Sequence, residues 1–323
     1  MNKTIETIAP RLTELMIRKI ETLTEEWHQP WVADTSGLPR NLRGTTYRAG
    51  NILLLAMLTE LEAFRAPVFM TFKQAKENGL SIRPGQSAFP IYFWKMYIRH
   101  KETRKQIDME VYRQLSTTEK LQYDLRPILR YYTVFNIDQT DMAETDPARY
   151  AELTKTAEPE DRSDGFVCTG IDALLEAEGW LCPIELEYSN KAFYSRMYDK
   201  IVCPLKRQFP SGVAFYDTLL HEVAHSTGHP NRLNRPAHLI IGDSAYAREE
   251  LVAELTSALC GAILGFSVAP RAENAAYLKH WLSQLKEEPT YLFDILVDVN
   301  KAARMIIDRI EPDTRREPYA AAA

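Results

Sequence analysis

The sequence of 323 residues is 45% hydrophobic and 26% charged, and its formal net charge is −5. This balance is typical of globular proteins and excludes disordered and fibrous chains, and the length suits about two domains. The longest apolar run, residues 51–58, is far shorter than the roughly 20 residues that cross a bilayer, and the first residues lack the apolar core of a signal peptide. We therefore expect a cytoplasmic protein with no membrane partner.

Charge is divided unevenly along the chain. Residues 1–135 contain 20 Lys and Arg against 14 Asp and Glu, a balance of +6, and residues 136–323 contain 19 against 30, a balance of −11. A polyanion would therefore bind the first part rather than the second, although a chance imbalance of solvated charges is the alternative. The four cysteines form no C-x-x-C pair, which argues against a disulfide framework and a thiolate zinc site.

The first 140 residues predict an α+β domain. Apolar residues from Leu12 to Trp27 recur every three or four positions, which indicates an opening helix that ends before Pro30. Residues 31–50 are rich in glycine and arginine and predict a long loop, followed by a helix from about Asn51. Apolar runs predict strands at 68–70, 89–94 and 131–136, with a helix at 71–78.

An acidic stretch separates this domain from a second one. Residues 138–165 contain nine Asp and Glu and two prolines, so we expect a linker at 141–165. Beyond it, we predict a second domain at 166–312 and a frayed tail at 313–323. The apolar pattern of the second domain indicates strands at 193–194 and 200–204, then helices at about 212–228, 246–264, 270–286 and 289–310.

The second domain carries a strong metal-site motif, His221-Glu222-Val223-Ala224-His225. On a helix, residues four apart lie on one face, so both imidazoles can reach one metal ion while Glu222 lies beside them. The alternative is two histidines on a half-exposed helix face. Apolar neighbours favour a buried site, and Gly228 is suited to ending the helix just after the second histidine.

A catalytic zinc needs a third protein ligand, for which the sequence offers three possibilities. The metzincin pattern would require a histidine where Asn231 stands, and His229 follows a glycine turn and precedes a proline. Glu250 is the stronger candidate, because it lies 25 residues past His225 on a predicted helix that can return antiparallel to the first. Glu254, one turn further on the same face, would then hold a ligand imidazole, with the reverse assignment as the alternative. We expect Glu249 to be solvated.

These residues predict a zinc metallopeptidase of the gluzincin type, with manganese as a possible substitute. Zinc would lower the pKa of a bound water toward roughly 7, and Glu222 would take its proton as general base. The alternatives for Glu222 are a supporting or a surface carboxylate, and we expect Tyr194 to be a core residue rather than a catalytic one. Whether the site is active stays open, because an intracellular protease without a nucleic-acid partner and a pseudo-enzyme with a structural zinc have the same ligands.

The sequence resembles the ArdC-type antirestriction proteins of conjugative plasmids over most of its length. The matching pieces are Pro30-Trp31, Leu38-Pro39-Arg40-Asn41, Gly44, Tyr47-Arg48, Asn51, Thr71-Phe72-Lys73-Gln74-Ala75, Gly79, Pro84-Gly85, Phe93-Trp94, Val134 to Gln139, Ala192-Phe193-Tyr194, His221 to Arg235 and Glu249 to Leu255. The sequence departs from the family pattern at Ser226 and Ala49. The resemblance implies an N-terminal domain that binds single-stranded DNA without sequence preference, a C-terminal zincin-like metallopeptidase domain, and a role in protecting incoming DNA of a mobile genetic element from restriction.

The residue types in the first domain agree with a single-stranded DNA partner. Binding a single strand requires cations along the phosphates and flat rings on which bases stack. The candidate DNA-binding residues are Trp31, Arg40, Arg43, Tyr47, Arg48 and Lys73. Arg83, Trp94 and Lys95 would extend the same groove, and packing in the core is the alternative for each aromatic residue. A protein or peptide is the expected second partner.

Overall fold

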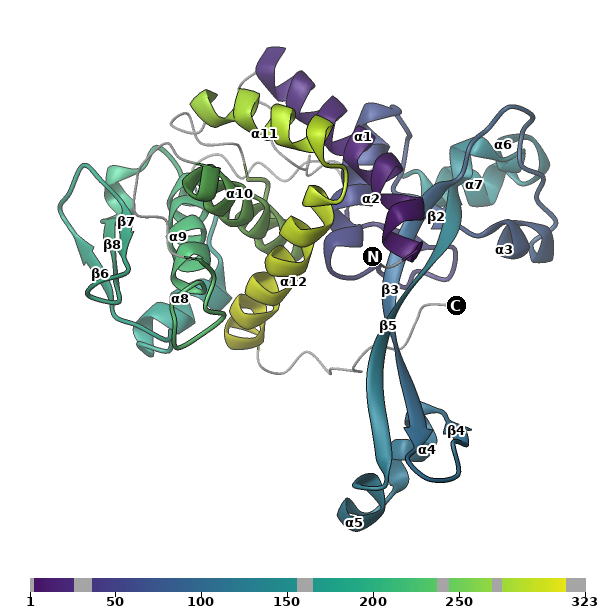
Figure 1. Cartoon of the computed structure of the whole chain (residues 1–323). Coiled ribbons are helices and arrows are strands. Elements are labelled where there is room, and N and C mark those ends of the chain that lie inside the picture. The colour runs from purple at the N-terminus through teal and green to yellow at the C-terminus, as the bar shows by residue number, and fades with distance from the viewer. Residues whose placement is uncertain (1–2, 26–36, 156–164, 237–243, 269–274, 312–323) are drawn as a thin grey trace.

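The computed structural model describes residues 3–25, 37–155, 165–236, 244–268 and 275–311. It shows the expected two-domain fold of mixed helix and sheet (Figure 1). Trp27 and Trp31 lie outside the described residues. No helix among the described residues is long and apolar enough to cross a membrane.

The N-terminal domain is built on a five-stranded sheet with the strand order β1-β2-β5-β3-β4. Its elements are α1 (Lys3–Glu25), β1 (Arg40–Asn41), α2 (Gly50–Leu61), β2 (Val68–Met70), α3 (Phe72–Glu77), β3 (Phe89–His100), β4 (Gln106–Ile107), α4 (Met109–Gln114), α5 (Thr117–Lys120) and β5 (Tyr123–Asn136). Each helix and strand predicted here from the apolar pattern is present. Helix α2 is almost entirely buried, as its run of leucines requires.

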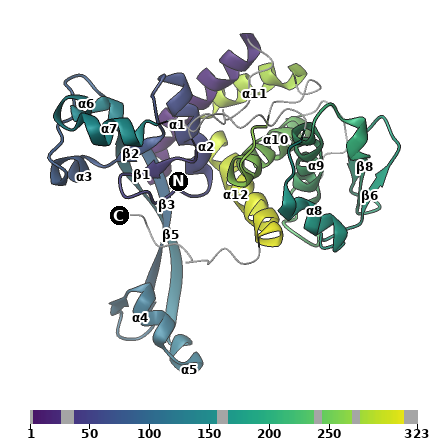
Figure 2. The same ribbon diagram turned by 180° about the vertical axis from the view of Figure 1, so that it is seen from behind.

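Strands β3 and β5 are much longer than predicted and form a projecting arm. They pair antiparallel from Phe89 opposite Val134 to His100 opposite Tyr123. The outer part of this ribbon extends away from the body of the molecule and carries β4, α4 and α5 at its tip (Figures 1 and 2). We call residues 93–130 the arm. The apolar pattern revealed only the buried base of these strands, because the outer halves are mostly half-buried and mix charged with aromatic and apolar residues.

Much of the expected acidic linker is folded onto the N-terminal domain. It forms η1 (Ile137–Gln139), α6 (Met142–Thr145) and α7 (Pro147–Leu153). The carboxylates act as local acceptors: Asp138 accepts the Arg65 N–H and the Tyr150 hydroxyl at 2.6 Å each, and Asp146 caps α7. Residues 156–164 of the expected linker lie outside the described residues.

The C-terminal domain packs helices beside a three-stranded sheet with the order β6-β8-β7. Its elements are α8 (Thr169–Glu176), β6 (Ile184–Glu187), β7 (Phe193–Ser195), β8 (Lys200–Pro204), η2 (Lys206–Gln208), α9 (Gly212–Ser226), α10 (Ser244–Leu264), α11 (Ala275–Glu287) and α12 (Tyr291–Ile310). Helices α9 and α10 lie against each other, and α12 lies between α10 and the N-terminal domain (Figure 1). All four predicted helices are therefore present.

The two domains share one hydrophobic core. Helix α1 packs on α11 and α12, and the buried side chains of Met16 and Trp281 belong to the same cluster. Asn300 of α12 accepts the Gly50 N–H at 2.6 Å and donates to the Tyr92 hydroxyl at 3.2 Å. These contacts fix the N-terminal domain against the helix that supports α10.

Candidate metal centre

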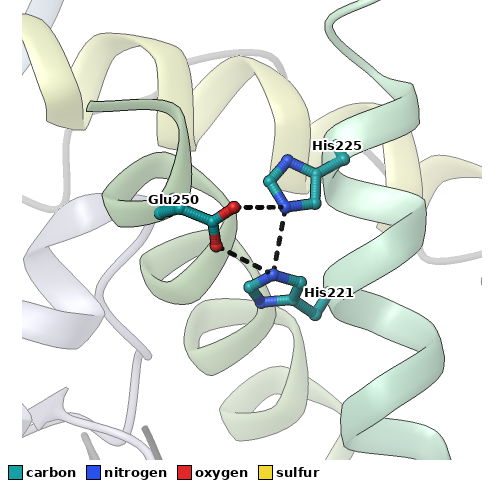
Figure 3. Close-up of side chains that lie close together, drawn as sticks. All are labelled: His221, His225 and Glu250. Carbon is teal, nitrogen blue, oxygen red and sulfur yellow. Dashed lines mark hydrogen bonds and ion pairs between the residues drawn. The ribbon is translucent and has the colours of Figure 1, made fainter. Parts of the chain in front are cut away.

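Helix α9 places the histidine motif inside the C-terminal domain. The Ser211 hydroxyl accepts the Ala214 N–H at 3.2 Å and caps the start of the helix. Phe215 and Leu219 are buried in the core on one side of α9. Further along the helix, the His221 and His225 side chains point toward α10 (Figure 3). Helix α10 is almost wholly buried, so it presents Glu250 to this face of α9 in a fixed position.

Three donor atoms converge between α9 and α10 (Figure 3). Nε2 of His221 lies 3.0 Å from Nε2 of His225, and the two carboxylate oxygens of Glu250 lie 3.4 Å and 3.6 Å from these nitrogens. Nitrogen and oxygen ligands about 2.1 Å from one tetrahedral ion are themselves about 3.3–3.4 Å apart. Among the described residues this is the group of His, Cys, Asp and Glu side chains with the spacing of a metal site.

The centre holds more negative charge than its own cations balance. Glu222, Glu249, Glu250 and Glu254 are all at most 6% exposed, and Arg235 is the one buried arginine among the described residues. Ionised carboxylates are costly to bury without a cation. Burial opposes the charged form of Glu250, but the two neighbouring histidines outweigh it and lower the pKa of Glu250. Burial also opposes protonation of His225, but Glu250 and Glu249 outweigh it and raise the pKa of His225 to about 10. The donor set therefore fits a divalent cation, which would compensate these charges.

Glu249 is buried and paired, so the expectation that it is solvated was wrong. Its two oxygens accept from the Arg235 guanidinium at 2.6 Å and 2.8 Å, and one of them lies 3.4 Å from Nδ1 of His225. Burial raises the pKa of Glu249, but Arg235 and His225 outweigh it and lower the pKa to about 2. The pair thus orients the His225 ring with its Nε2 toward Glu250. Arg235 lies outside any predicted element, so helix periodicity could not reveal it.

Glu254 lies on the side of His221 that faces away from Glu250. Its carboxylate oxygen is 4.0 Å from Nδ1 of His221, which is longer than a hydrogen bond. The side chain is 1% exposed. Support of the His221 ring by Glu254 stays a prediction.

Glu222 borders a cavity of about 580 Å³ that opens onto His221, His225 and Glu250. One Glu222 oxygen accepts the backbone N–H of Tyr194, on the edge strand β7, at 3.0 Å. The Tyr194 hydroxyl donates to Asp199 and accepts from Arg232.

The wall of the cavity contains residues that the sequence analysis did not single out. Tyr246 precedes Glu250 by one helical turn and lines the cavity, and burial next to Glu250 raises the pKa of its hydroxyl. Spacing on α10 could have suggested Tyr246. Lys191, Phe193 and Arg196 also line the cavity, from β7 and the chain around it.

His229, the alternative third ligand, lies in a different environment. Its Nδ1 is 3.9 Å from an Asp199 oxygen, and it does not belong to the group formed by His221, His225 and Glu250. The glycine turn that follows α9 accounts for this separation.

The candidate DNA-binding residues of the N-terminal domain divide into exposed and buried ones. Arg43 and Arg48 are exposed, and the Lys73 side chain is 86% exposed. Arg40 is half-buried and donates to the Leu153 carbonyl at 3.2 Å. Tyr47 is 6% exposed and packs edge-on against Phe69, which corresponds to the core alternative for this ring and not to base stacking. Arg83, a proposed extension of the groove, pairs with Glu144.

Two family models match the chain, one for each domain. The N-terminal domain of the anti-restriction factor ArdC matches residues 6–135, and a zincin-like metallopeptidase domain matches residues 170–295. The first range contains almost all of the five-stranded sheet, and the second contains the histidine motif and Glu250.

Relatives and solved structures resemble the chain over both domains. A DNA primase TraC of Escherichia coli is 31% identical over 92% of this chain, and an uncharacterized protein y4eC of Sinorhizobium fredii is 29% identical over 88%. The chain spans 27% of that primase and 87% of y4eC. The crystal structures of the antirestriction protein ArdC from plasmid R388, metal-free and Mn(II)-bound, match with TM-scores of 0.66 and 0.65 and identities of 26% and 25%. They cover 94% and 95% of this chain, and the chain covers 98% and 99% of theirs.

Proposed function

The chain belongs to the ArdC-type antirestriction proteins, and from this premise we propose that it binds single-stranded DNA through its N-terminal domain and holds a zinc-dependent peptidase site in its C-terminal domain. The observation that carries the peptidase part is the convergence of His221, His225 and Glu250 inside a pocket of buried carboxylates. The Mn(II)-bound neighbour supports a divalent ion, and the nitrogen-rich donor set favours zinc.

The site residues would divide the work of amide hydrolysis. His221, His225 and Glu250 would hold the ion, which supplies Lewis acidity and makes water more acidic. Glu222 borders the cavity and is fixed by the Tyr194 N–H, so it can accept a proton from water and return it to the departing amine. Glu249 and Arg235 would keep the His225 ring in position.

The peptidase part is tested with Glu222→Gln. The substitution removes the proton acceptor and leaves the three ligand side chains in place. We expect hydrolysis of fluorescently labelled casein to fall by about 10²–10⁴-fold while the metal content, measured by mass spectrometry, stays the same. Glu187→Gln, an exposed carboxylate on β6, is the control. A zinc-loaded wild type without activity on casein and peptide libraries would favour a structural metal.

The DNA part is tested on the loop of residues 37–48, of which Arg43 and Arg48 are exposed. We expect a labelled oligo(dT) strand to bind the wild type with an affinity that falls steeply with salt, because each phosphate contact releases a counterion. The triple change of Arg40, Arg43 and Arg48 to alanine should weaken this binding. Equal affinity for the triple variant and the wild type would exclude the loop as a binding site, and a wild type that does not bind would refute the DNA part.

A further inference from the structure

The arm has one apolar face that the protein partly covers itself. In the antiparallel register Trp94 lies opposite Leu129 and Ile98 opposite Leu125, which places these side chains on one face of the ribbon. Ile98 and Leu129 are fully buried, whereas Leu125 is 38% exposed. At the tip, Tyr112 of α4 packs against Tyr123, which lies on the same face. This cover explains how a two-stranded ribbon, marginal by itself, is stable so far from the body.

The other face of the arm alternates cations with aromatic and apolar side chains. The register sets Phe93 opposite Arg130, Lys95 opposite Ile128, Tyr97 opposite Arg126 and Arg99 opposite Asp124. Lys95, Arg126 and Arg130 are exposed, whereas Phe93 and Tyr97 are half-buried between them. Lys95, Arg126 and Arg130 form no salt bridge within 4.0 Å to any residue that the structure describes.

The positive charge of this face favours binding of a polyanion. Diagonal neighbours across an antiparallel ribbon are about 7–8 Å apart, so Lys95 has Arg126 and Arg130 as close positive neighbours with one acidic residue, Asp124, further along the face. Residues 93–130 contain nine Lys and Arg against five Asp and Glu, which is +4 of the +6 carried by residues 1–135. A cluster of like charges is unfavourable in the free protein and becomes favourable beside phosphates.

The aromatic residues between the cations select a single strand. Bases of a single strand expose their flat faces, and proteins bind them by stacking on aromatic side chains beside a row of cations. From Phe93 to Arg99 the strand rises about 20 Å, which is long enough to contact several nucleotides of a single strand. Tyr97 and Phe93 each lie directly opposite an arginine, so a base stacked on the ring places its phosphate beside the guanidinium.

We propose that this face of the arm, defined by Phe93, Lys95, Tyr97, Arg126 and Arg130, is a contact surface for single-stranded DNA. The proposal rests on the proposed function of the N-terminal domain and adds a surface that the loop of residues 37–48 does not include. The arm and the loop belong to one sheet, since β1 and β3 flank β2 and β5.

The cationic part is tested with a variant of the full chain in which Lys95, Arg126 and Arg130 are changed together to alanine. We call it the arm variant. Binding of labelled oligo(dT) is measured by fluorescence anisotropy from 50 to 300 mM salt. We expect affinity at about 100 mM salt to fall at least about 10-fold, and the slope of log affinity against log salt to become less steep by about 2. The matched control removes three exposed cations of the C-terminal domain, Arg207, Lys301 and Arg304, and should bind as the wild type does.

The aromatic part is tested with Tyr97→Leu, which keeps apolar volume and removes the flat ring. Affinity should fall at least about five-fold with the salt slope unchanged, because stacking contributes without releasing counterions. Tyr188→Leu, at an exposed tyrosine of the C-terminal domain, is the control. Circular dichroism melting verifies that each variant is folded.

The outcomes separate the arm from the function on which it rests. A wild type that does not bind oligo(dT) refutes the proposed DNA binding itself. A wild type that binds, together with a folded arm variant of equal affinity and slope, overturns only the arm. Tighter binding of duplex than of oligo(dT), lost in the arm variant, would also overturn the proposal, because it would assign the ribbon to a groove of duplex DNA. A change in oligomeric state without a change in DNA affinity would assign the arm to protein contacts and overturn it as well.

Discussion

The metal centre and the arm are opposite in charge and in exposure, and their charges are compensated in different ways. At the centre, four buried carboxylates gather around two histidines, and one buried arginine, Arg235, compensates part of their charge. On the arm, exposed cations stand among aromatic rings with few acidic neighbours. A buried charge must be paired within the protein, whereas water solvates an exposed charge until a ligand binds it. Substitutions at the centre should therefore change stability and metal affinity, and substitutions of the exposed cations should change the proposed DNA binding alone.

The largest effect is expected for Arg235→Met, which leaves Glu249 buried without its cation. We expect the free energy of unfolding to fall by about 3–5 kcal/mol, because an uncompensated buried charge is strongly destabilising. Urea unfolding followed by circular dichroism measures it. Arg207→Met, at an exposed position, should change stability by less than about 0.5 kcal/mol. A loss for Arg235→Met as small as that of the control would show that the charges at the centre are not coupled to folding.

Metal removal should have the next largest effect. Stripping the protein with a chelator withdraws the proposed counter-charge, and a metal present at 100 to 1,000 times its dissociation constant contributes about 3–4 kcal/mol. The thermal midpoint should fall accordingly and recover with zinc or manganese. The arm variant should show the same fall, because its substitutions lie outside the centre. Identical melting of stripped and loaded protein would contradict a metal at this site.

Glu249→Gln should weaken metal binding without unfolding the protein. The amide keeps the volume but loses the charge that orients His225, and changes of this kind reduce metal affinity by about 10–100-fold. Competition with a chromophoric chelator measures the affinity, and oligo(dT) binding should be unchanged. The same affinity in Glu249→Gln and in wild type would mean that Arg235 and Glu249 serve the fold only.

The smallest effect is expected for Lys73→Ala, at a candidate DNA-binding residue of the N-terminal domain. Its side chain is 86% exposed and lies 3.7 Å from Glu77, so the thermal midpoint should not move. The salt slope of oligo(dT) binding should become less steep by about 0.7, the share of one phosphate. Lys301→Ala is the matched control at an exposed position. An unchanged slope would remove Lys73 from the path of the DNA.

The sequence predicted the features that are local along the chain. The pairing of His221 with His225 follows from the helical repeat, and Glu250 could be inferred because the second helix is also periodic. The partnership of Glu249 with Arg235 joins a helix to an irregular segment and becomes visible only in three dimensions. The outer arm escaped prediction because its strands alternate exposed cations with half-buried rings rather than apolar with polar residues. The acidic stretch after residue 138 looked like a linker because charge composition does not distinguish solvated acids from capping ones.

The common core of α1, α11 and α12 has a consequence for which fragments of the gene can encode a folded protein. A gene fragment that ended near residue 140 would encode an α1 whose apolar face, including Met16, has lost its cover of Trp281 and its neighbours. Such a product would aggregate, so recombination should keep both halves together. The match to the primase TraC spans 92% of this chain, and so includes both domains, although it covers 27% of the primase.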